Sequence, residues 1–170
     1  MEQPIEIVEK NSVYTLEIKE RIPGWKIQAI ISRANRDIEK YLSKSKSEPS
    51  GSLFVRYVGI DWNLMNNKNI ITRFIRKFTK KWNMVIGFPV KTELKGRRKI
   101  RPGVFSGGKY VKTIHRGAYQ KVGNTYLKLL EYLKSNDMNY KPESVEIYLN
   151  DPYKTNEEDL ETIVMIPISE

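Results

Sequence analysis

The stretch VEIYLNDP, residues 145–152, alternates aliphatic side chains with polar and aromatic ones. A two-residue period is typical of a strand with one buried face. Val145 and Ile147 fall on one face of this predicted strand, and Glu146 and Tyr148 fall on the other. The pattern therefore places a carboxylate beside a phenol. It leaves open whether these two groups face solvent or line a pocket.

The stretch also has a counterpart earlier in the chain, which indicates an internal duplication. VRYVGID (55–61) aligns with EIYLND (146–151), and GFPV (87–90) aligns with MIPI (165–168). In this alignment Tyr57 matches Tyr148, Val55 matches Glu146, and Pro89 matches Pro167.

Each half then reads strand, helix, strand, strand. Strand alternation at 13–18 precedes an amphipathic helix at 25–42, and a strand at 108–117 precedes a second helix at 118–136. The sequence thus predicts an α+β fold. Both helices cover one face of an antiparallel sheet, and a ligand cleft lies at the pseudo-two-fold seam between the halves.

The predicted organisation is a single domain over residues 1–170. The first half spans 5–94 and carries one insertion, an amphipathic basic helix at 67–81 that the second half lacks. A basic, glycine-rich linker of low order is predicted at 95–108. The second half spans 109–170.

Composition excludes several kinds of site. With no cysteine there is no disulfide, no thiolate nucleophile and no cysteine zinc site. His115 is the only histidine, so we expect no metal and no cofactor, and a role for His115 in shaping the turn before Gly117. The N-terminus lacks a secretory signal and no apolar run approaches the ~18 residues of a membrane span, so we expect a cytoplasmic protein.

Positive charge is concentrated in one stretch. Residues 73–101 contain eleven basic residues and one acidic residue, which equals the whole net charge of +10. Such a patch is either a solvated face or a surface for nucleic acid. Its candidate contact residues are Arg73, Arg76, Lys77, Lys80, Arg97, Arg98, Lys99 and Arg101.

Three motifs together resemble the GyrI-like effector-binding domain, which also forms the drug-sensing half of some bacterial transcription activators. They are TIHRGAYQKVGNTYLKLLEYL (113–133), VEIYLNDP (145–152) and LETIVMIPI (160–168). The signature covers residues 110–170 and, through the duplication, 5–94. Its matching positions are His115, Gly117, Tyr119, Glu146, Tyr148, Asp151, Pro152 and Pro167. Ala118 departs from the family, which usually has proline there, and proline at a first helical position is replaceable.

The resemblance implies a small-molecule cleft that is lined by aromatic residues and contains the strand glutamate. In relatives this glutamate pairs with lipophilic cationic drugs, and one branch hydrolyses cyclopropane-containing toxins with the carboxylate and a tyrosine. Trp25, Trp62 and Trp82 are either cleft walls or core residues. The predicted ligand-binding residues are Glu146, Tyr148, Tyr57, Val55, Tyr119 and Trp62.

Three functions follow as hypotheses. Because no helix-turn-helix segment precedes the domain, we expect first a stand-alone binder of amphipathic, cationic small molecules. The alternative is a hydrolase of strained cyclopropanoid compounds with Glu146 and Tyr148 as catalytic residues. The third hypothesis is association of the basic patch with DNA or with a gyrase-type protein partner.

Overall fold

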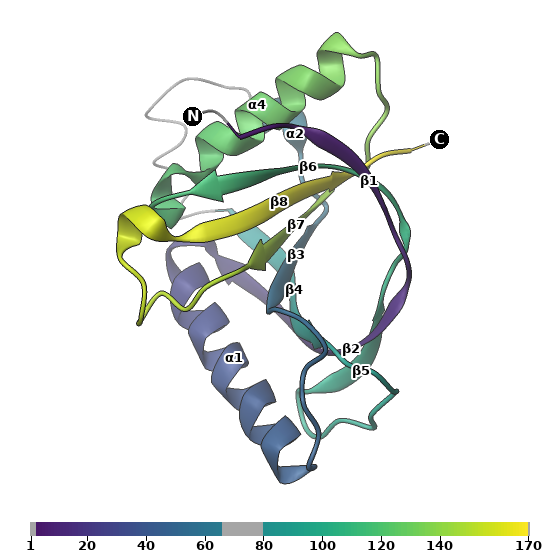
Figure 1. Ribbon diagram of the computed structural model, residues 1–170, viewed down its shortest axis with the longest axis vertical. Helices are drawn as coiled ribbons and strands as arrows, with labels where there is room; N and C mark the ends of the chain where they lie inside the picture. The colour runs from purple at the N-terminus through teal and green to yellow at the C-terminus, as the bar shows by residue number, and fades with distance from the viewer. Residues whose placement is uncertain (1–2, 66–79, 170) are drawn as a thin grey trace.

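The computed structural model describes residues 3–65 and 80–169. Their strands form one antiparallel eight-stranded sheet in the order β1-β6-β8-β7-β3-β4-β2-β5. The sheet curls, and helices α1 and α4 lie against it (Figure 1). The predicted α+β class is confirmed.

Both halves have the predicted order of elements. The first contains β2 (Val13–Pro23), α1 (Ile27–Lys44), β3 (Phe54–Val58) and β4 (Lys81–Pro89). The second contains β6 (Gly108–Arg116), α4 (Val122–Ser135), β7 (Glu143–Tyr148) and β8 (Glu161–Pro167). Short 3-10 turns precede α1 (η1, Gly24–Lys26) and α4 (η2, Tyr119–Lys121), and η3 (Glu157–Asp159) precedes β8. A short helix, α2 (Trp62–Met65), follows β3.

The two halves join where β3 pairs with β7 at the centre of the sheet. In this register Val55 lies directly opposite Glu146, its counterpart in the internal alignment. Two equivalent residues can pair directly across antiparallel strands only at a two-fold axis. The pseudo-two-fold axis therefore passes between Val55 and Glu146.

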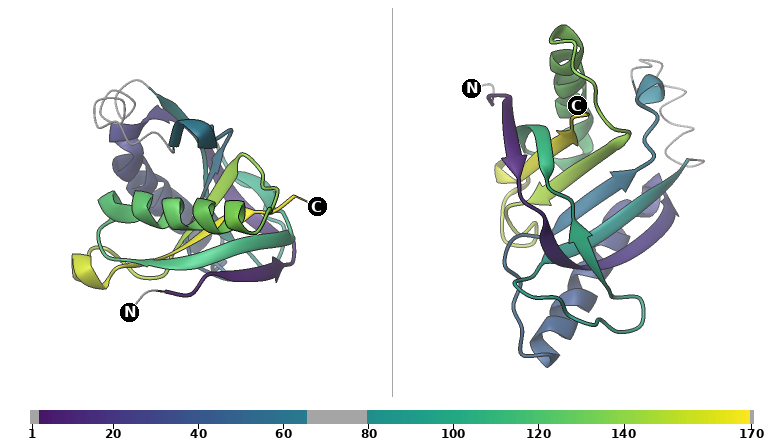
Figure 2. Two further views of the ribbon diagram at one scale, coloured as in Figure 1. Left: turned by 90° about the horizontal axis from the view of Figure 1, so that it is seen from above. Right: turned by 90° about the vertical axis from the view of Figure 1, so that its right-hand side faces the viewer.

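Both helices cover the same face of the sheet, as predicted. In α1 the buried residues recur at steps of three or four, which makes a single apolar stripe: Ile31, Ala34, Ile38 and Leu42. The stripe of α4 contains Tyr126, Leu129, Leu130 and Leu133. Both stripes belong to one core with the inward side chains of the sheet. The view from above shows α4 lying across its half of the sheet (Figure 2).

A second, smaller core lies on the opposite, concave face of the sheet. It contains Phe54, Val85, Phe105, Tyr110, Val145 and Met165. The two ends of the sheet approach each other here, because β1 leads into β2 and β5 leads into β6 through connections of two residues each. The Gly107 N–H donates to Ser12 Oγ at 2.8 Å and links these two connections.

Two strands were not predicted. Residues 95–108 were expected to have low order, but β5 (Arg101–Phe105) pairs there with β2 as an edge strand. The sequence does not indicate this strand because it contains Pro102 and Gly103. The edge position tolerates the proline, and a Cβ in place of the glycine would meet the Glu17 carboxylate. The other unpredicted strand, β1 (Glu6–Lys10), pairs with β6 at the opposite edge.

The inserted basic helix predicted at 67–81 lies almost entirely outside the described residues. Its predicted end is wrong, because β4 already begins at Lys81. At the other strand-to-helix turn, Ala118 has φ −55°, within the range that proline adopts, so the family geometry is kept. His115 contacts Thr125 Oγ1 at 2.8 Å and Ala118 O at 3.0 Å, which ties this turn to α4.

Gly87 should be intolerant of a side chain, because β4 has close neighbours on both sides. An added Cβ would lie 2.5 Å from the Leu16 carbonyl oxygen and 3.0 Å from the Phe54 ring. Overpacking of this kind costs about 1–3 kcal/mol. We expect Gly87→Ala to lower the free energy of unfolding by this amount in chemical denaturation, and exposed Ser52→Ala to leave it unchanged. Equal stabilities of the two variants would contradict this packing.

Candidate functional site

Glu146 lies in the middle of β7 and points toward the helices. Its neighbours Val145 and Ile147 point into the concave-face core, so alternation along the strand determines its direction. Only 6% of Glu146 is exposed. The choice left open by the sequence is therefore decided: this carboxylate does not face bulk solvent.

Two tyrosine hydroxyls satisfy the carboxylate. Tyr126 of α4 donates to Oε1 at 2.9 Å, and Tyr148 of β7 donates to Oε2 at 2.7 Å. The Tyr126 oxygen is also 3.0 Å from Ser144 Oγ. Because a hydroxyl has one proton to donate, Ser144 is the donor to Tyr126 in this pair. The result is a chain of hydrogen bonds from Ser144 through Tyr126 to Glu146.

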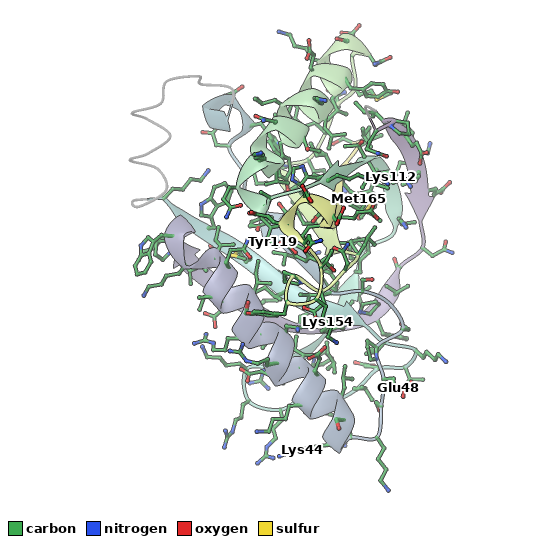
Figure 3. The ribbon with its side chains drawn as sticks, turned by 60° about the vertical axis from the view of Figure 1, so that its left-hand side comes forward. Lys44, Glu48, Lys112, Tyr119, Lys154 and Met165 are labelled. Carbon is green, nitrogen blue, oxygen red and sulfur yellow. The ribbon has the colours of Figure 1, made fainter. Side chains whose placement is uncertain are left out.

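Aromatic rings enclose this group. The Tyr119 and Tyr148 rings meet edge to face at 5.4 Å, and the Tyr57 and Trp82 rings at 5.7 Å. Trp62 packs against Tyr126 at 6.0 Å. In Figure 3, Tyr119 lies between the N-terminal ends of α1 and α4. We call the enclosure formed by Tyr57, Trp62, Trp82, Tyr119, Tyr126 and Tyr148 the aromatic cage.

Burial shifts the acid–base properties of the whole group. Desolvation raises the pKa of Glu146 above its usual value, and the hydrogen bonds from Tyr148 and Tyr126 oppose part of that rise. Three tyrosines have pKa values raised well above 10: Tyr57, Tyr126 and Tyr148. Burial is the largest cause, and the charge of Glu146 is the second. The tyrosines therefore remain neutral donors at physiological pH.

Most residues proposed from the sequence do come together here. Val55 lies opposite Glu146 and is fully buried, and Trp62 donates from Nε1 to Lys141 O at 2.9 Å. Trp82 belongs to the cage as well. Trp25 is 53% exposed and is neither core nor part of the cage.

Two residues of the site were not predicted. Tyr126 was recognised as part of a helix stripe, but nothing in that periodicity distinguishes a tyrosine in the core from one that bonds a carboxylate. Thr162 of β8 lies opposite both Tyr148 and His115 in the strand register. It is 1% exposed, and within the described part of the chain its hydroxyl has no hydrogen-bond partner. A buried hydroxyl without a partner is unusual and costs stability.

Side chains close over Glu146, and the cleft expected at the seam stays a prediction. Tyr57 and Tyr126 are buried, whereas Tyr119 and Tyr148 are half-buried and form the outer side of the cage. Two cavities lined by described residues lie elsewhere: one is on the concave face, and the other is beneath α1, beside Arg33 and Lys99.

The family model described as the GyrI-like small molecule binding domain matches residues 3–169. The chain belongs to this family. No curated protein is significantly similar to it in sequence.

Solved structures share the fold of this GyrI-like domain at low sequence identity. A structure of EcmrR with DNA has a TM-score of 0.76 and 15% identity over 99% of this chain, which spans 58% of the EcmrR chain. The EcmrR C-terminal domain alone is matched over 99% of its length, with TM-score 0.67 and 17% identity over 100% of this chain.

Two further relatives each match at 14% identity. A hydrolase from Listeria innocua has a TM-score of 0.62, covering 97% of this chain and 91% of its own. SAV2435, solved with bound tetraphenylphosphonium, has a TM-score of 0.61, covering 99% of this chain and 94% of its own. At such identities the likeness shows the fold alone.

The structure describes part of the basic patch of this GyrI-like domain. Arg73, Arg76 and Lys77 lie outside the described residues. Lys80 stacks over Trp82, near the start of α1, because Trp82 pairs with Ile22 of β2.

Arg97, Arg98 and Lys99 precede β5, and Arg101 begins it. The Gly96 N–H donates to Tyr41 near the end of α1, whereas Lys99 is paired at 3.0 Å with Glu20, which also pairs with Arg33 in the first half of that helix. Binding of DNA or protein to the patch stays a prediction.

Within residues 3–65 and 80–169, no set of three or more acidic or histidine side chains is arranged to hold a metal ion. In the same part of the chain, no helix is both long and apolar enough to cross a membrane.

The raised pKa of Glu146 should make stability depend on pH. A carboxyl whose pKa is higher in the folded state than in the unfolded state stabilises the fold when protonated. Its contribution is complete below the unfolded pKa and is lost as pH rises through the folded pKa. As pH rises through the folded pKa, the wild type loses this contribution and Glu146→Gln does not. We therefore expect the free energy of unfolding of Glu146→Gln to increase relative to that of the wild type over this pH range, as measured by denaturation at a series of pH values. A constant difference between the two proteins would contradict the assignment.

Proposed function

We propose that this GyrI-like domain binds amphipathic organic cations against Glu146. The observation that carries the proposal is a buried carboxylate with no positive partner. Among the described residues, no lysine, arginine or histidine is ion-paired with Glu146, and its two hydrogen bonds come from neutral tyrosines. An ionised carboxylate in such a place lacks a counter-charge.

A delocalised cation supplies what this site lacks. It compensates the carboxylate without requiring directed hydrogen bonds, and the ring faces of the cage add cation–π attraction of about 0.5–2 kcal/mol each. Its apolar groups lie against Tyr57, Trp62 and Trp82. Glu146 is the carboxylate buried within the cage, whereas Asp151 acts from outside on Tyr119, so we expect the buried end of the ligand to carry a single positive charge.

Ligand entry requires the outer side of the cage to open. Tyr119, Tyr148 and Trp82 are the half-buried members, and the first two meet edge to face at 5.4 Å beside the bond from Tyr148 to Glu146. We propose that these two rings separate to admit a ligand, while Tyr126 keeps its bond to Oε1. The solved complex of SAV2435 with tetraphenylphosphonium supports this class of ligand.

Tetraphenylphosphonium is a suitable probe because its charge does not titrate. At 100 times Kd it should stabilise the protein by about 2.7 kcal/mol. Its affinity, measured by calorimetry, should rise with pH as Glu146 ionises and then level off. In Glu146→Gln we expect a loss of tenfold or more and no pH dependence.

Glu131→Gln removes one negative charge from the exposed side of α4 and is the matched control. It should bind tetraphenylphosphonium as the wild type does. Equal losses in the two variants would mean that overall charge, and not the carboxylate of Glu146, attracts the cation.

The contact between Glu146 and Tyr148 favours a second candidate, hydrolysis of a strained small molecule. A buried carboxylate with a raised pKa is suited to general acid–base catalysis. Glu146 would take a proton from a water molecule that adds to one ring carbon. Tyr148 would give its proton to the carbon released when the ring bond breaks, and recover one through its 2.7 Å bond to Glu146. A structural relative from Listeria innocua is described as a hydrolase.

Turnover distinguishes this candidate from simple binding. If the domain is a hydrolase, mass spectrometry should detect a product one water heavier than a cyclopropanoid substrate. Tyr148→Phe and Glu146→Gln should then reduce the rate at least a hundredfold, since general acid–base groups contribute about 10²–10⁴-fold. Glu131→Gln should retain the wild-type rate. Unchanged substrate across a panel of such compounds would leave binding as the function.

A further inference from the structure

The concave face of the sheet contains an arginine in an unusual environment. Arg56 lies on β3, beside the residue that marks the pseudo-two-fold axis, and points away from the aromatic cage. Its strand neighbours are Val85 of β4 and Val145 of β7, both in the concave-face core. Arg56 is therefore surrounded by apolar side chains on both flanking strands.

The guanidinium of Arg56 is incompletely satisfied. Its Nε atom is cut off from solvent and has no hydrogen-bond partner within residues 3–65 and 80–169. None of the ion pairs in this part of the chain includes Arg56. Arg56 as a whole is half-buried, and Nε is the atom that is cut off from water. A buried polar atom normally has a partner, because its desolvation is costly. The unpartnered Nε therefore points to a group that binds it.

A cavity of about 120 Å³ opens beside this arginine. This volume is on the scale of a cavity that holds one benzene ring, about 150 Å³. The rings of Phe105 and Tyr110 form part of the lining and stack at 5.9 Å. Tyr110 is held in place by donating to Ser106 O at 2.8 Å. One side of the wall is therefore aromatic, and a hydrogen bond holds it in place.

The charges around this cavity favour an anion. Arg56, Lys109 and Lys141 line it, against one carboxylate, Glu143. Burial is the largest cause that raises the pKa of Tyr110. The charge of Glu143, which lies nearby, adds to this rise, and the charge of Arg56 opposes it. Glu143 nevertheless forms no ion pair with Arg56 within the described part of the chain. The net charge of the residues that line the cavity is therefore positive, and Arg56 remains available to bind an anion.

We propose that this cavity is a second ligand site, which binds a small carboxylate with an apolar body no larger than one ring. The carboxylate bonds to the guanidinium of Arg56, which matches its planar geometry. The apolar body lies against Phe105 and Tyr110, and the two lysines at the rim attract the anion. The site lies on the opposite face of the sheet from Glu146 and does not depend on the function proposed there.

Benzoate and benzamide test this site, because they have the same shape and differ in charge. We expect benzoate to bind the full chain in a titration followed by amide chemical shifts, with changes around residues 105–110 and 141–145, and benzamide to bind at least tenfold more weakly. Equal binding of the two compounds, or no binding of benzoate at millimolar concentration, would overturn the proposal. Inorganic phosphate binding as tightly as benzoate would overturn the requirement for an apolar body.

Variants localise the binding. Arg56→Met should reduce benzoate affinity at least tenfold and melt no lower than the wild type, because it removes a cation that has no partner. Arg36→Met on the exposed side of α1 removes the same charge and should bind benzoate normally. Glu146→Gln should also bind normally. Loss of benzoate binding in either of the last two variants would place the anion elsewhere and refute the assignment.

Discussion

The carboxylate of Glu146, held by two tyrosine hydroxyls at the junction of the two halves, is the constraint on which the rest of the site depends. A charged group in a protein core is tolerated only when its hydrogen-bonding capacity is met. Tyr148 meets part of that need from the same strand, and Tyr126 meets part from the helix above. Both donors are neutral, and in the part of the chain that the structure describes no cationic side chain pairs with this carboxylate. The surrounding rings then make this lone charge a feature that a ligand can recognise.

The duplication explains where this carboxylate lies and why it is single. Two similar halves that meet along antiparallel strands place equivalent residues opposite each other at the axis. One of these residues is Glu146 and the other is Val55. Around them the duplication provides two equivalent tyrosines, Tyr57 and Tyr148. The architecture is thus nearly symmetric, whereas the charge is not, which suits a ligand with one charged end.

The central strands also carry opposite charges on opposite faces. Glu146 points toward the helices, and Arg56, on the neighbouring strand, points into the concave face. Each is surrounded mainly by apolar side chains, and within the described residues neither has an ion-pair partner. Because the sheet separates them, they cannot neutralise each other. One domain thereby presents an anionic and a cationic environment near the same axis.

Local patterns in the sequence were sufficient for much of this structure. Alternation at 145–149, helical stripes and the two matching segments predicted the element order of each half, the α+β class and a shared face for Glu146 and Tyr148. They were sufficient because strand and helix periods are properties of neighbouring residues. Edge strands β1 and β5, the hydrogen bond from Tyr126, the unpartnered Thr162 and the ion pair of Lys99 with Glu20 were decided only by the tertiary structure. Each of these depends on segments far apart in the chain, and a local period contains no information about which distant partner a side chain meets.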